Sequence, residues 1–197
     1  MPQRAIIAPP PNGRGPALRV LSVQLPQPSA LDPSTDAQVY ATLAIMRALV
    51  QDAPRWPAVV RLMRRCSAAA NPMQQVYQEM KRVTFQADPR RAEVVRHPEL
   101  MARELEQTGT TRGDCDDRAT LGASILAMLG TRPVFVVMSR SPRGNFEHVF
   151  FGVRTDNRRT APRPAQVVPM DPQERTPFGH WTPPLPTGGR MHIEDAT

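Results

Sequence analysis

The stretch TGTTRGDCDDRATLGASILAMLG (residues 108–130) decides the fold, because it predicts a helix that begins beside a cysteine. Apolar residues recur at helical spacing along 122–129. Gly130 follows where a left-handed glycine commonly ends a helix. The spacing therefore predicts a helix over 116–129, with Cys115 at or just before its first turn.

Three aspartates surround Cys115 and raise a question about its thiol. Nearby carboxylates favour the neutral thiol, which is a poor nucleophile. Negative side chains also stabilise a helix N-terminus, so Asp116 and Asp117 suit the first turn and Asp114 suits the N-cap. The N–H groups exposed at a helix start favour the thiolate. A reactive Cys115 therefore needs the helix start and a cation nearby.

Two residues further along the chain can complete a cysteine site. His148 lies in the strand-like run 145–153, and Asp171 follows the next such run. Side chains on neighbouring strands lie about 4.8 Å apart and can touch. Each of the three residues has an ordinary structural explanation when it is considered alone. Cys115 would be a small buried residue, His148 a core histidine and Asp171 a turn residue. Their order favours a nucleophile Cys115, a base His148 and an orienting Asp171.

The remaining patterns predict helices first and antiparallel strands last. Turn signals interrupt residues 86–113, where we expect at most a helical turn before a Gly/Thr loop. This order predicts an α+β fold, with helices packed on one side of a small antiparallel sheet. The predicted helices before the cysteine cover 32–53, 54–70 and 71–85, and the strands cover 133–139, 145–153 and 165–171.

The 23 prolines are about twice the usual share of roughly 5%, and they are clustered. Most lie near the two ends of the chain. Such segments are extended or disordered when alone. We therefore expect a Pro-rich N-terminal arm over 1–33, one folded domain over 34–175 and a Pro-rich C-terminal tail over 176–197.

The chain has a net charge of +7, and Lys81 is the one lysine among its 25 basic residues. An anionic partner and an arginine-rich codon bias both explain this charge. No aromatic stacking set accompanies the scattered arginines, so nucleic acid is the less favoured partner. No signal-peptide core and no membrane-length apolar run is found, so we expect a cytoplasmic protein without a membrane span.

The other candidate ligand residues predict no metal or cofactor. Cys66 lies on an apolar helical stripe and is predicted to be core. We expect it and Cys115 to be reduced rather than bridged. His97, His180 and His192 lack zinc-ligand spacing with the cysteines.

Several motifs around Cys115, His148 and Asp171 resemble those of a known family. GDCDDRATLGASILAMLG, followed by PVFVVMS, EHVFFGV and VVPMDP, is similar to the transglutaminase-like superfamily of cysteine enzymes over about residues 75–175. VTFQADPRRAEVVRHPELMARELE resembles the approach to the cysteine in phage and prophage members. The resemblance implies a papain-like fold and gives Cys115, His148 and Asp171 the roles of nucleophile, general base and acid, and orienting residue.

The resemblance leaves two functions open. The first is a hydrolase or acyltransferase that acts on a peptide or protein amide through a thioester, usually without a metal. The second is a phage virion or assembly protein that keeps the fold as a binding module, with partners on its Pro-rich arms. Family members usually carry an upstream aromatic residue or glutamine at the oxyanion hole, for which Tyr77 and Gln107 are the candidates.

Overall fold

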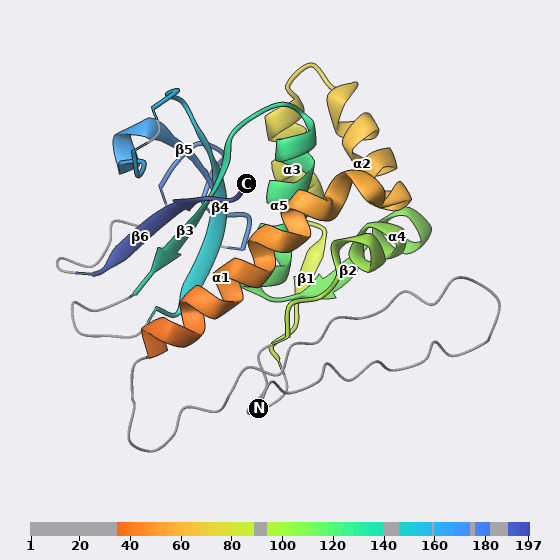
Figure 1. The fold of residues 1–197 in the computed structure, drawn as a ribbon. Coiled ribbons are helices and arrows are strands. Elements are labelled where there is room, and N and C mark those ends of the chain that lie inside the picture. Colours follow the sequence, from red (N-terminus) through yellow and green to blue (C-terminus); the bar gives the residue numbers. More distant parts are fainter. Residues whose placement is uncertain (1–34, 89–93, 140–145, 159, 174–175, 182–188) are drawn as a thin grey trace.

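Helix α5 (Cys115–Met128) lies at the centre of the protein, with the other helices on one side and a sheet on the other (Figure 1). Its side chains from Asp116 to Leu126 are buried. The structure is a computed structural model, and the predicted α+β class is confirmed. It describes residues 35–88, 94–139, 146–158, 160–173, 176–181 and 189–197.

Among the described residues, four helices precede α5 and two short 3-10 turns complete the helical part. A small parallel pair of strands, β1 and β2, leads into α5, and a larger sheet follows it. The helices are α1 (Thr35–Asp52), α2 (Pro57–Ser67), α3 (Pro72–Met80) and α4 (Pro98–Thr108), and the 3-10 turns are η1 (Ala53–Arg55) and η2 (Pro164–Gln166). The strands are β1 (Val83–Phe85), β2 (Thr111–Gly113), β3 (Pro133–Met138), β4 (His148–Arg154), β5 (Val167–Met170) and β6 (Met191–Asp195).

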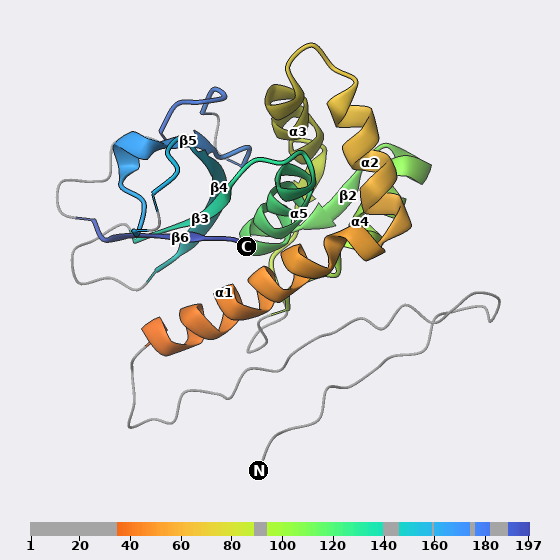
Figure 2. The ribbon, with the colours of Figure 1, turned by 45° about the horizontal axis from the view of Figure 1, so that its top comes forward.

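The larger sheet is antiparallel throughout, in the order β5-β4-β3-β6. Figure 2 shows α5 beside this sheet and the other helices beyond it. Alternate residues of β3 point to opposite faces, so Phe135 joins the main core with α5 while Val136 joins a smaller cluster on the outer face. Trp181 packs against that outer cluster. Both faces of the central strands are therefore buried.

One glycine sets the distance between α5 and the sheet. A Cβ added at Gly122 would lie 2.6 Å from the ring of Phe151 in β4. Real Cβ atoms essentially never approach a neighbour so closely. The helix therefore packs on β4 at a distance that only glycine allows at this position. This contact joins the middle of α5 to the middle of β4.

The structure differs from the sequence predictions at three places. The helix predicted over 71–85 ends at Met80, and Val83–Phe85 form strand β1 because they pair with β2. Residues 98–108 form a full helix, because Pro98 occupies the first turn, where its missing N–H costs no bond, and Gly109 closes the end with φ 80°. Residues 191–195, within the predicted tail, pair with β3 as strand β6. The predicted arm over 1–33 lies outside the described residues.

No described helix combines the length and the apolar character that crossing a membrane requires.

Candidate active site

Cys115 is the first residue of α5 and follows β2 after one residue. At this position its N–H has no acceptor within the helix. Asp117 Oδ2 accepts a hydrogen bond from the Asp114 N–H (3.2 Å), which closes the turn around the cysteine. A Cβ at Gly113 would lie 2.7 Å from that oxygen. The shape of this turn therefore requires glycine at position 113.

His148 and Asp171 lie in contact, as the sequence predicts. Nε2 of His148 is 2.7 Å from Oδ2 of Asp171. Strands β4 and β5 are paired, and Asp171 directly follows β5, so the sheet delivers the carboxylate to the imidazole. Asp171 is buried (2% exposed), and its Oδ1 accepts from the Gln173 N–H. The carboxylate therefore occupies Nε2 and leaves Nδ1 of His148 for another partner.

The Cys115 thiol is the neighbouring group, since both residues line one cleft and a hydrogen bond and charge from Cys115 act on the His148 imidazole. Burial lowers the pKa of His148, but hydrogen bonds and charges from Asp171 and Cys115 outweigh it and raise the pKa to about 10. The imidazole is then a cation at neutral pH. An imidazolium beside the sulfur, together with the helix start, favours the thiolate. The structure brings the three predicted residues together.

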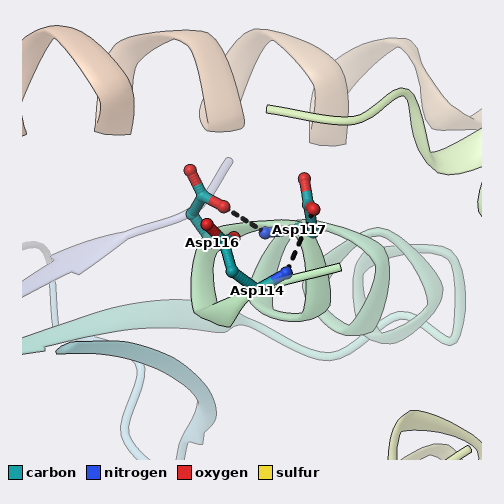
Figure 3. A group of neighbouring side chains, drawn as sticks. All are labelled: Asp114, Asp116 and Asp117. Atoms are coloured by element: carbon teal, nitrogen blue, oxygen red, sulfur yellow. Dashed lines mark hydrogen bonds between the residues drawn. The ribbon is translucent and has the colours of Figure 1, made fainter. Parts of the chain in front are cut away.

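The three aspartates at the start of α5 lie on the side of the helix that faces α1 (Figure 3). Asp117 serves the backbone, because its carboxylate accepts from the N–H groups of Arg96 and Asp114. Burial and the charge of Asp114 raise the pKa of Asp117 to about 7. Burial and the neighbouring Asp114 carboxyl raise the pKa of Asp116 well above its ordinary value. Part of the negative charge around Cys115 is thereby neutralised.

Asp114 is the N-cap residue by position, as predicted, but its side chain does not cap the helix in the expected way. The Asp117 N–H bonds instead to Asp116 Oδ1 (2.6 Å). Two buried carboxylate oxygens, Asp114 Oδ1 and Asp116 Oδ2, have no hydrogen-bond partner among the described residues. The cluster therefore keeps two acceptors that the local backbone does not use.

Arg118 contributes a buried positive charge on the first turn of α5. It is 5% exposed and donates a hydrogen bond to the Val83 carbonyl of β1. Burial lowers its pKa, while the charges of Asp171 and Cys115 favour the protonated form. A second cation besides His148 thus lies near the sulfur. Arg118 is absent from the site residues predicted from the sequence, where its position three residues after the cysteine was the available signal.

A cleft of about 660 Å³ opens beside the cysteine. Its walls come from α1, the segment after β1, the start of α5 and the start of β4, and Cys115 and His148 both line it. Sequence analysis did not identify Phe85, Asp88 or Gln173 as residues of this cleft. Phe85 and Asp88 belong to a segment that pairs with β2 and so reaches the cysteine. The pairing of β1 with β2 joins segments that are distant along the chain, so the periodicity of apolar residues does not predict it.

Neither candidate for the oxyanion hole lines the cleft. The Tyr77 hydroxyl is buried and donates to the Thr176 carbonyl, and Gln107 is exposed on α4. Gln173 does line the cleft, two residues after Asp171. The Cys115 N–H and the Gln173 side chain are therefore the candidate donors for an oxyanion.

The sequence predicts no metal site and a core position for Cys66. Within the described part of the chain, carboxylate oxygens of Asp114, Asp116 and Asp117 lie within 4.8 Å of one another and form a possible cation-binding group. Asp117 already accepts two N–H donors, so the other two supply the unused oxygens. Cys66 is fully buried in the core, as predicted, and its thiol is free.

The arrangement can perform nucleophilic chemistry on an acyl carbon. A half-exposed sulfur lies at a helix start, in contact with an imidazole that a buried carboxylate orients. An open cleft gives a substrate access to the sulfur. No protein-family model, no curated protein and no solved structure matches the chain.

Proposed function

We propose that this protein is a transglutaminase-like cysteine hydrolase or acyltransferase with a papain-like core, acting on a peptide or protein amide through a thioester. The observation that carries the proposal is the chain of contacts from Cys115 through His148 to Asp171. The nucleophile helix packed on an antiparallel sheet supports the papain-like assignment. The order of the three residues along the chain also agrees with it.

In the first half of the reaction, the Cys115 thiolate attacks the carbonyl carbon of the amide. The resulting oxyanion lies near the helix start, where the Cys115 N–H can donate to it. His148 then gives its Nδ1 proton to the leaving nitrogen. The C–N bond breaks, an amine departs and the acyl group remains on sulfur as a thioester. Asp171 keeps Nε2–H in place, so that Nδ1 faces the sulfur throughout.

In the second half, neutral His148 takes a proton from an incoming nucleophile. Water gives a carboxylic acid, and a primary amine gives a new amide. The C–S bond breaks, and the sulfur is released as the thiolate beside the imidazolium. The proton count closes, because the proton lost to the leaving amine is recovered from the nucleophile. His148 is the one protein group in this scheme that changes its protonation state.

The test is cleavage of a library of blocked peptides, followed by mass spectrometry. We expect products from the native protein and none from Cys115→Ala, because the thioester cannot form. Hydroxylamine added during turnover should convert the acyl products to hydroxamates, which reports the thioester directly. Replacing Asp171 by Asn should lower the rate at least about tenfold, since the imidazole loses its charged partner.

Cys66→Ala is the matched control, because it removes the other thiol of the chain from a site outside the cleft. It should retain the product pattern of the native protein. Equal product formation by the Cys115→Ala protein would contradict the proposal. A complete lack of products and of hydroxamates from the native protein would instead favour the binding-module alternative.

A further inference from the structure

The cleft beside Cys115 differs in charge from the chain as a whole. The chain carries a net charge of +7, yet none of the described residues that line the cleft is lysine or arginine. The His148 imidazole is the basic group on its wall. Carboxylates that line a cleft raise the local concentration of cations. The acidic residues on the walls are Asp88, Asp114, Asp116 and Glu147.

Two of these carboxylates have oxygens that can accept a donor from a ligand. Asp116 is 2% exposed, and its Oδ2 has no hydrogen-bond partner among the described residues. Asp114 is partly exposed, but its Oδ1 is buried and likewise has no hydrogen-bond partner among the described residues. Figure 3 shows both carboxylates at the start of α5, on the side towards α1. The two carboxyl groups are hydrogen-bonded to each other and burial raises the pKa of Asp116, so together they keep negative charge that a ligand with a cationic N–H donor can neutralise.

The opposite wall of the cleft is apolar. Helix α1 contributes Val39, Leu43 and Met46, and β1 contributes Phe85, whose ring is 55% exposed. An exposed phenylalanine on a cleft wall is available for contact with a ligand. A hydrated metal ion gains nothing from such a wall, because it requires oxygen ligands. An aliphatic stem that ends in a cation matches both walls at once.

We propose that the cleft binds a cationic side chain of the substrate, with its aliphatic stem on α1 and Phe85 and its ammonium or guanidinium group at Asp114 and Asp116. This inference rests on the proposed function and gives its substrate class, a lysine- or arginine-containing peptide. An ammonium that carboxylates hold stays protonated and has no lone pair for attack. The bound cation is therefore an anchor that positions a neighbouring amide at Cys115, and it is not the acyl acceptor.

The test measures binding of three simple probes to the Cys115→Ala protein by calorimetry in the presence of a chelator. The probes are hexylammonium, hexanol and hexanoate, which share a stem and differ in the head group. We expect hexylammonium to bind at least about tenfold more tightly than hexanol, and hexanoate not to bind. The variants Asp114→Asn and Asp88→Asn should each reduce this preference, because they remove charge from two separate walls.

Glu106→Gln is the matched control, since it removes one carboxylate charge on α4, where Glu106 pairs with Arg61. It should retain the full preference for hexylammonium. Equal affinity for hexylammonium and hexanol, or no binding of either, would overturn the inference. A metal site would also overturn the inference. It would show as Ca²⁺ binding in the absence of chelator that the Asp114→Asn substitution abolishes and that hexylammonium does not displace. Because Cys115 is replaced in these proteins, a negative binding result does not bear on the thioester chemistry. The peptide-cleavage experiment tests that chemistry separately.

Discussion

The two cysteines of this chain occupy opposite environments. Cys66, on α2, is fully buried, and burial followed by the charge of Glu79 raises the pKa of its thiol to about 12. Cys115, on α5, is half-buried, lines a cleft and contacts the His148 imidazole. One carboxylate, that of Glu79, acts on Cys66, and three aspartates flank Cys115. The difference between them is the presence of a cation within hydrogen-bonding reach and a helix start.

The two cysteines show what decides whether acidic neighbours keep a thiol protonated. At Cys66 burial is the largest cause of the raised thiol pKa, the charge of Glu79 adds to it, and the charge of Arg65 opposes it only in part. At Cys115 two of the aspartates serve the helix start, and their own pKa values are raised by burial. His148 and the buried Arg118 supply positive charge on the same side. Local charge balance, and not the count of acidic residues in the sequence, decides the state of the sulfur.

The largest expected contrast is in the rates of alkylation of the two thiols. At pH 7, a thiol with a pKa of about 12 is thiolate in only roughly 1 molecule in 100,000, and Cys66 is also inaccessible. We expect iodoacetamide to label Cys115 more than about 1,000-fold faster than Cys66. Peptide mapping by mass spectrometry during a time course measures both rates in one sample. Equal, slow labelling of both thiols would remove the distinction.

The next contrast depends on His148. In the His148→Ala protein, Cys115 loses the imidazolium, and at pH 6 its alkylation should slow by roughly 100-fold, because an ordinary thiol is then almost entirely protonated. The pKa of about 10 keeps His148 charged across pH 6–9. The gap between the two proteins should therefore narrow as the pH rises to 9, where an unassisted thiol ionises by itself.

The slow rate of Cys66 serves as the internal control for this experiment, and it should be the same in both proteins. A gap that stayed constant from pH 6 to pH 9 would mean that His148 affects access to the sulfur and not its ionisation.

The sequence predicted the elements that local patterns determine. The helix that follows Cys115, the strands that carry His148 and precede Asp171, and the core position of Cys66 follow from periodicity and turn residues. The α4 helix was missed because Pro98 was interpreted as a turn signal, although proline also suits the first turn of a helix. Strand β6 was missed because its pairing with β3, more than 50 residues away, determines it.

The cleft was less predictable than the three central residues. Phe85 and Asp88 lie about 30 residues before Cys115 and reach it through the parallel pairing of β1 with β2. Parallel pairing joins segments that are distant along the chain, so it leaves no local periodicity. The roles of Gly113 and Gly122 also depend on close contacts, with Asp117 and with Phe151. Only coordinates reveal such contacts.

The smallest expected contrast is in stability. Replacing Cys66 by Ser puts a hydroxyl into a fully buried, apolar position, which should lower the free energy of unfolding by about 1–3 kcal/mol. Replacing Cys115 by Ser should cost less than about 1 kcal/mol, because the site is open to solvent and the hydroxyl can still bond to His148. Urea unfolding of both variants beside the native protein measures the two values. If Cys115→Ser were the more destabilising change, the sulfur and the imidazole would be a structural part of the core. The distinction between Cys66 as a packing residue and Cys115 as a reactive residue would then be wrong.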